Sequence, residues 1–291
     1  MNLQLDATQH RLTDAVGKQE AAAAPDASGW DVLDAVGLSE LLAPAPGARP
    51  LFGQLEWLLV LEELGAGCRP HTLVRSVRSY LDVYAEGGHA PAAAEAYRAW
   101  VGDHRTAPAA ADALVEYAPD GRWRLSEPRP EALAGLPQPV LDASAANAAR
   151  DRDLLALAAY ACGVARRCLE AAQERAGERV VAGRRLLEHQ GTAHRIARCA
   201  VDLTIARIGL WRAAHGEDEG VPAGHLAPSA AAACVSAALD SAHTVVQAFG
   251  AAGTSDPGIV RLFRTACSLP ALTGSPRALW QEAGARLPLT V

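Results

Sequence analysis

The long helical periodicity of the C-terminal half most constrains the fold of this chain. Between residues 150 and 249 apolar side chains recur every three or four positions, interrupted by only two prolines. The pattern predicts helices over 150–176, 187–214 and 228–249, the last so rich in alanine that neighbouring helices can approach it closely. Two further helical segments flank the bend Leu272–Pro276. We therefore expect a mainly α fold that ends in an antiparallel four-helix bundle.

The rest of the chain divides into two zones. Residues 1–104 have helical periodicity, including "GQLEWLLVLEELGAG" and two later segments at 71–85 and 91–102. Residues 105–148 are broken by prolines, and "ALVEYAPDGRWRLSE" alternates around Pro-Asp-Gly, as β-hairpins do. The sequence thus predicts an N-terminal helical domain (1–104), a reduced β insert (105–148) and the bundle (149–291).

Composition excludes several classes of function. A net charge of -6 without long basic runs argues against a nucleic-acid partner. The six cysteines form no Cys-x-x-Cys pair and read as reduced, buried residues, while the N-terminus lacks the pattern of a signal peptide. Together with the lack of an evident membrane span, this predicts a cytoplasmic protein. His189 and His194 lie five positions apart, so no metal site is expected.

Five stretches, in chain order, resemble the acyl-CoA dehydrogenase family. They are "LLVLEELG" (58–65), "AAYACGVARRCLEAA" (158–172), "GRRLLEHQGTAHRIARCAVDLTIARIGLWRAA" (183–214), "VVQAFGAAG" (245–253) and "RLFRTACSL" (261–269). The resemblance implies the order of domains given above, α,β-dehydrogenation of an acyl thioester with FAD, and association through the bundles. The expected substrate is acyl-CoA or a carrier-bound acyl group. The third bundle helix and its glycine-rich exit would otherwise leave an apolar face in water, which predicts an oligomer.

The resemblance also implies which residues contact the cofactor. Residues 179–183 are similar to the family's Arg-x-x-Phe-Gly, whose arginine meets the flavin pyrophosphate across the dimer. The implied positions are Arg179, Gln190, Gln247, Gly250 and Ser275. Two departures oppose FAD binding, because Ala182 replaces the family's Phe and Ala251 replaces its second Gly. The insert is also much shorter than the family's β-domain and lacks its Thr-Glu-Pro type motif.

The catalytic base is the largest departure. The family's usual carboxylate precedes Gly-Thr in the C-terminal loop, a position that is Thr273 here. Some members instead place the base on the first bundle helix, 30 positions before the Gly of Arg-x-x-Phe-Gly, and that count from Gly183 gives Asp153. Two readings stay open: Asp153 is the base, or Asp151 and Asp153 merely occupy a first helical turn, where the dipole favours them.

Three hypotheses follow for the function. The first is a flavin-sharing subunit of a heteromeric acyl-CoA dehydrogenase, whose partner is a full-length member of the family. The second is a flavin-free enzyme of polyketide or other natural-product biosynthesis, a lyase or cyclase that uses the same cleft for dehydration, isomerisation or cyclisation. The third is a non-catalytic scaffold subunit. A homo-oligomer remains an alternative to the heteromer.

Overall fold

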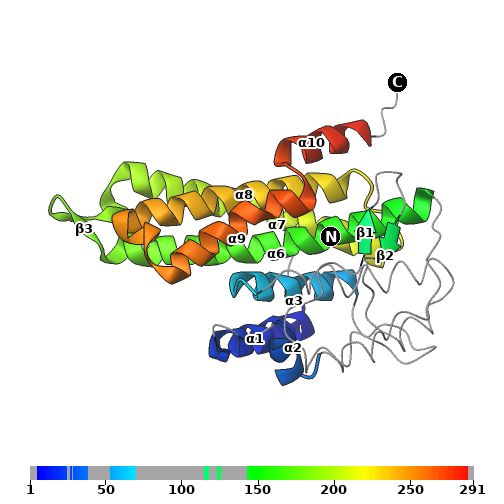
Figure 1. The fold of residues 1–291 in the computed structure, drawn as a ribbon, viewed down its shortest axis with the longest axis horizontal. Coiled ribbons are helices and arrows are strands. Elements are labelled where there is room, and N and C mark those ends of the chain that lie inside the picture. Colours follow the sequence, from blue (N-terminus) through cyan, green and yellow to red (C-terminus); the bar gives the residue numbers. More distant parts are fainter. Residues whose placement is uncertain are drawn as a thin grey trace.

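The C-terminal half of the protein is an antiparallel helical bundle, as predicted (Figure 1). The computed structural model describes residues 5–24, 27, 29–38, 53–69, 115–117, 123–125 and 143–287. The bundle consists of α6 (Ala143–Glu178), α7 (Gln190–Asp218), α8 (Leu226–Phe249) and α9 (Pro257–Thr273), followed by the short helix α10 (Pro276–Ala285). Helix α8 is the central element, because it packs against α6, α7, α9 and α10.

The alanine-rich α8 is a core helix. The stretch Leu226–Thr254, which adds the short 3-10 helix η3 (Gly250–Thr254), is long and apolar enough to span a membrane, with a mean hydropathy of 1.2. In the structure 61% of its most apolar window is buried. The neighbours of this third helix in the bundle therefore cover most of it, whereas Ala251 and Ala252 of its glycine-rich exit are exposed.

A small β-hairpin joins α6 to α7 at one end of the bundle (Figure 1). Strand β3 (Val180–Val181) pairs antiparallel with β4 (Arg184–Arg185), and the 3-10 helix η2 (Leu186–Glu188) leads into α7. Ala182 and Gly183 form the turn with φ of +51° and +76°. Two consecutive positive φ values suit the twist of a two-residue hairpin, but alanine adopts this conformation at a cost that glycine avoids.

An N-terminal layer of helices lies against the bundle (Figure 1). It consists of α1 (Ala7–Ala22), α2 (Gly29–Ala35) and α3 (Gln54–Ala66). Asp6 caps α1, because its Oδ1 accepts hydrogen bonds from the amides of Thr8 (2.7 Å) and Gln9 (2.8 Å). Helix α3 is capped from α7, since Asp218 accepts hydrogen bonds from the amides of Gln54 (2.5 Å) and Leu55 (3.1 Å).

A buried carboxylate links the N-terminal layer to the bundle. Glu62 of α3 lies 3.1 Å from Arg207 Nη2 of α7 and 3.7 Å from Arg166 Nε of α6. Burial raises the pKa of Glu62, although both guanidinium groups act to lower it. The charges of three helices thus meet at one point and fix how α3 crosses the bundle.

The predicted β-hairpin of the insert is present. Strands β1 (Val115–Tyr117) and β2 (Trp123–Leu125) pair antiparallel, with Val115 opposite Leu125. The predicted helices at 71–85 and 91–102 lie outside the described residues. Helix α6 begins at Ala143, within the segment assigned to the insert, and the three domain boundaries remain predictions.

Candidate functional site

Thr273, at the position of the family's base, ends α9 and is buried. Its hydroxyl lies within hydrogen-bond distance of the carbonyl oxygens of Leu269 (3.1 Å) and Gly274 (2.9 Å), to which it can donate. The hydroxyl therefore bonds to the end of its own helix, and it is not a base near neutral pH.

Ser275, one of the predicted cofactor contacts, has a structural role on the other side of the bend. Gly274 has φ of +94°, which turns the chain, and Ser275 is the N-cap of α10. The Ser275 Oγ accepts a hydrogen bond from the amide of Ala278 at 3.2 Å. The bend Leu272–Pro276 thus connects two helices through capping contacts.

Asp151 and Asp153 do not lie in a first helical turn, so the dipole reading is wrong. Helix α6 begins at Ala143, which places both carboxylates in its third turn, and both are buried. Residues two positions apart point to different sides of a helix, so the two carboxylates serve different environments. Asp153 remains the carboxylate that the family resemblance supplies.

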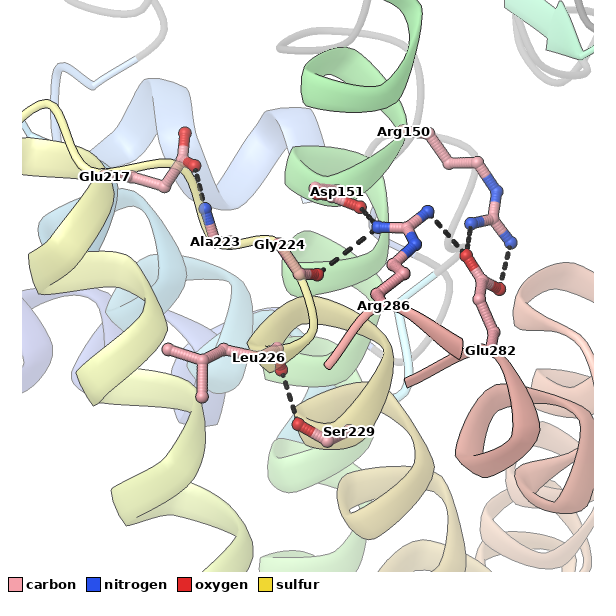
Figure 2. Close-up of polar contacts among 9 residues, drawn as sticks. All are labelled: Arg150, Asp151, Glu217, Ala223, Gly224, Leu226, Ser229, Glu282 and Arg286. Atoms are coloured by element: carbon pink, nitrogen blue, oxygen red, sulfur yellow. Dashed lines mark hydrogen bonds and ion pairs between the residues drawn. The ribbon is translucent and has the colours of Figure 1, made fainter. Parts of the chain in front are cut away.

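Asp151 belongs to a network of ion pairs that fastens α10 to the start of the bundle (Figure 2). Arg286 Nη1 lies 2.5 Å from Asp151 Oδ1, and the same nitrogen lies 3.3 Å from the carbonyl oxygen of Gly224. Arg286 Nη2 donates to Glu282 at 2.6 Å, while Arg150 forms a two-pronged ion pair with Glu282. Two arginines and two carboxylates therefore neutralise one another across α6 and α10.

Burial affects the two carboxylates of this network differently. Burial raises the pKa of Asp151 and outweighs the opposing hydrogen bond and charge of Arg286. For Glu282 the burial is weaker, and the hydrogen bonds and charges of Arg150 and Arg286 together lower its pKa. Neither carboxylate is poised as a free base, because each is held by a guanidinium group.

The loop before α8 is fixed in the same region (Figure 2). Glu217 Oε1 accepts a hydrogen bond from the amide of Ala223 at 2.7 Å, and its Oε2 lies 3.0 Å from Arg152 Nε. These contacts bind the end of α7 and the following loop to α6, in the same region as the ion pairs of α10. The sequence pattern contained no local signal for them, because partners such as Asp151 and Arg286 are 135 positions apart.

Two of the predicted cofactor residues meet at the opposite end of the bundle. Arg179 Nη1 donates to the carbonyl oxygen of Ala248 at 2.9 Å, at the end of α8. Gly250 follows with φ of +66°, and a Cβ there would lie 2.7 Å from Arg179 Nη1. Gln247 is exposed on the last turn of α8, and Gln190 is exposed at the start of α7. The hairpin that follows Arg179 and the exit of α8 thus form one local surface.

The predicted site residues therefore fall into two groups far apart. Helix α9 separates them, because it begins near Gly250 and ends at Thr273 (Figure 1). Its 17 residues rise by ~1.5 Å each, which gives a separation of roughly 25 Å. Arg179, Gln247 and Gly250 lie at one end, while Thr273 and Ser275 lie at the other.

A polar cavity of about 710 Å³ lies between the N-terminal layer and the bundle. Its lining includes charged residues that pair across it, such as Arg69 with Glu20 (2.8 Å) and Arg166 with Glu63 (2.7 Å). The cavity lies between α1, α3, α6 and α9, so it is separate from the ion-pair network of α10. Among the described residues no group of three His, Cys, Asp or Glu side chains is placed to hold a metal ion.

Comparison with known proteins identifies the bundle. The family described as "Acyl-CoA dehydrogenase, C-terminal domain" matches residues 146–287, which span α6 to α10. A chain of the "ChsE4-ChsE5 complex from Mycobacterium tuberculosis" has the same fold, with a TM-score of 0.75, 20% identity and 100% of both chains covered. Butyryl-CoA dehydrogenase from Megasphaera elsdenii gives a TM-score of 0.73 and 18% identity over 98% of this chain and 99% of that chain.

These matches fix the class of the protein. An N-terminal helical layer, a small β region and an antiparallel helical bundle define an acyl-CoA dehydrogenase fold. The bundle, residues 146–287, belongs to this family's C-terminal domain. At the position where the family pattern described above has its usual base, the bundle carries Thr273 and not a carboxylate.

Proposed function

We propose that this protein is a subunit of a heteromeric acyl-CoA dehydrogenase that takes part in α,β-dehydrogenation of an acyl thioester, with the base supplied by a partner chain. One observation carries the proposal. Thr273, at the base position, is buried and bonded to its own helix, whereas Arg179 and Gly250 keep a close pairing at the other end of the bundle. A chain that keeps these flavin-side residues but lacks the loop carboxylate fits a site shared between two chains better than a complete site within one chain.

The chemistry explains why the missing base matters. Removal of the proton next to a thioester carbonyl needs a positioned acceptor such as a carboxylate. Thr273 cannot serve, and Asp151 is committed to Arg286. A partner chain that keeps its loop carboxylate would restore this function.

The residues at the hairpin end fit the diphosphate of a flavin in part. Arg179 offers a guanidinium group fixed by the Ala248 carbonyl, and the absence of a Cβ at Gly250 leaves room for that group beside the backbone. Arg179, Gln247 and Gly250 would hold the diphosphate and its neighbouring groups. A bound flavin would supply the acceptor for the hydride that leaves the β-carbon. Ala251, which is exposed, carries a methyl group where the family has glycine, and this methyl group limits how closely a phosphate can approach the backbone.

The separation of the two groups fits a flavin held between two chains, and Thr273 favours a heteromer because two identical chains would both lack the loop carboxylate. One flavin lying at the hairpin end would be roughly 25 Å from the loop of Thr273 in the same chain. Arg179 is therefore placed to contribute to a flavin whose catalytic surroundings belong to another chain. Two similar structures are described as pairs of proteins, the ChsE4-ChsE5 complex and the "Tcur3481-Tcur3483 steroid ACAD G363A variant".

Co-expression with the full-length acyl-CoA dehydrogenase encoded nearest to this chain tests the proposal. We expect a stable complex that absorbs visible light as a flavoprotein, and an Arg179→Gln variant that assembles with less flavin. Arg184→Gln is the control, since Arg184 lies in the same hairpin with an exposed side chain. A colourless complex that ignores added FAD would contradict the proposal, as would an isolated chain that binds flavin and turns over substrate alone.

Asp153 supports the second candidate, a flavin-free enzyme that acts on a thioester. It is a buried carboxylate on α6, and a buried carboxyl is suited to acid-base work. If the purified protein is colourless but active, the Asp153→Asn variant should lose most of its turnover while keeping its thermal stability. Unchanged turnover would remove Asp153 as the base.

A further inference from the structure

Helix α7 carries an exposed apolar stripe on the side that faces away from the bundle core. Val201, Ile205 and Ile208 are 56%, 62% and 39% exposed. Single exposed apolar residues are ordinary, but these three lie on successive turns at spacings of four and three. The buried side of the same helix, with Ile196, Leu203 and Leu210, packs into the core. Helix α7 is therefore apolar on two sides.

The stripe continues with charged residues at the same spacing toward both ends of the helix. Alternating steps of four and three make one continuous seam, as in coiled coils, and every position in it is exposed. We call this set the α7 seam; its members are His194, Arg198, Val201, Ile205, Ile208, Arg212 and His215. Its order is symmetric, with three apolar residues at the centre, an arginine on each side and a histidine beyond each arginine.

This symmetry decides against a second copy of the chain as the partner. In an antiparallel pairing centred on Ile205, Arg198 of each copy would meet Arg212 of the other. In a parallel pairing each arginine would meet its own equivalent. Like charges opposite one another across a helix interface oppose association. Both arrangements of two copies therefore place arginine on arginine at each end of the apolar contact.

The charges instead fit a partner with carboxylates. Arg212 has no ion pair with any other described residue, whereas Arg198 has only an exposed contact of 3.6 Å with Asp202 along the same helix. His215 similarly contacts Glu219 at 3.4 Å. Arginine is well suited to pairing with carboxylates at interfaces, and the chain as a whole has a net charge of -6. The seam is thus a basic-ended surface on an acidic protein.

We propose that the α7 seam docks an amphipathic helix of a different protein, with an apolar centre and a carboxylate flanking it at each end. The inference deepens the proposed function, on which it rests for the existence of a partner subunit. It adds which surface receives the partner and what chemistry the partner must present. The apolar centre supplies the contact, and the two arginines select a heteromeric over a homomeric pairing.

Two synthetic helical peptides test the proposal on the full-length chain. Both carry leucine at seam spacing; one has glutamate at the flanking positions and the other has lysine. We expect fluorescence anisotropy to show about tenfold tighter binding of the glutamate peptide, with a preference that shrinks as salt is added. The double variant Arg198→Glu/Arg212→Glu should reverse the preference.

The apolar centre is tested by Ile205→Ser, which should abolish binding of the glutamate peptide. Val221→Ser is the matched control, because Val221 is 58% exposed but lies in the loop after α7; this variant should bind as the wild type does. Circular dichroism confirms that each variant is folded. Equal binding of both peptides, binding that survives Ile205→Ser, or no binding would overturn the proposal.

The oligomeric state of the isolated chain gives a second test. A dimer that Ile205→Ser converts to monomer would show that a second copy occupies the seam, and would also overturn the proposal. These measurements need no flavin, so their failure is distinguishable from failure of the proposed function. A colourless co-expressed complex would contradict the shared-flavin function alone. A yellow complex without the peptide preference would contradict the proposed docking on the α7 seam alone.

Discussion

The crossing of α3 over α6 depends on Gly163, and replacing it with alanine should destabilise the protein. A Cβ on Gly163 would lie 1.9 Å from the carbonyl oxygen of Glu62 and 2.7 Å from the amide nitrogen of Ala66. The contact is reciprocal, because a Cβ on Gly65 would lie 2.2 Å from the carbonyl oxygen of Tyr160. The two helices therefore touch backbone to backbone, and no side-chain rotation can relieve the clash.

The expected loss of stability follows from how far α3 and α6 must move apart. Contacts to a Cβ essentially never fall below 3.0 Å, so the helices must move apart by about 1 Å. Overpacking of this kind costs ~1–3 kcal/mol, and a clash with rigid backbone belongs at the upper end. Alanine gains about 1 kcal/mol over glycine as a helix former, so Gly163→Ala should lose about 2 kcal/mol of unfolding free energy.

Gly209→Ala on α7 is the matched control. Gly209 is also inside a long helix, but nothing lies within 4 Å of the position of its Cβ. This variant should gain ~0.5–1 kcal/mol from helix propensity alone. Urea unfolding followed by circular dichroism measures both variants. If Gly163→Ala proved as stable as the wild type while Gly209→Ala was stabilised, the argument for a backbone-to-backbone crossing would be refuted.

Three smaller changes test other contacts by the same unfolding measurement. Asp218→Ala should cost about 1 kcal/mol because it removes the cap of α3, and Asp202→Ala, on the exposed side of α7, should cost less; equal losses would argue against the cap. Ala182→Gly should stabilise the hairpin by about 0.5 kcal/mol, since glycine accepts φ of +51° more readily, and a destabilised variant would contradict this. The pKa of Glu282 is lowered from 4.5, so its ion pairs stabilise the fold above that pH and are lost as the pH falls through the lowered pKa. Glu282→Gln should therefore make the unfolding free energy depend less on pH in acid. An unchanged pH dependence would show that these ion pairs contribute little to stability.

Local signals in the sequence predicted the helices well and their partners poorly. The bundle helices and the hairpin around Pro119 follow from periodicity and turn residues, which act over a few positions. The start of α6 at Ala143 was missed, because the alanine-rich segment before Asp151 has no apolar stripe to reveal it. Because α6 starts earlier than predicted, Asp151 lies outside its first turn, and its partner Arg286 is too distant in sequence for any local pattern to predict.

The exposed side of α7 shows a different limit of periodicity. Ile196, Ile205 and Ile208 all belong to the apolar pattern of the helix predicted at 187–214, yet only Ile196 is buried. The frequency of apolar residues predicts a helix but does not show that the helix has two apolar sides. The spacing of the residues does show this, because the buried residues and the α7 seam occupy different registers of the same helix.

The position of the α7 seam connects the two proposals. Only the short helix η2 separates α7 from the hairpin that follows Arg179, so the His194 end of the seam lies near the surface where Arg179 meets Gly250. A partner helix docked along the seam would start beside this surface and run along α7 toward the opposite end of the bundle. The His194 end of the seam and the residues proposed to hold a flavin therefore share one end of the bundle, while the end that lost the base is closed by the ion pairs of α10. On this arrangement Ile205→Ser should lower both assembly and flavin content, whereas Arg179→Gln should lower flavin content alone.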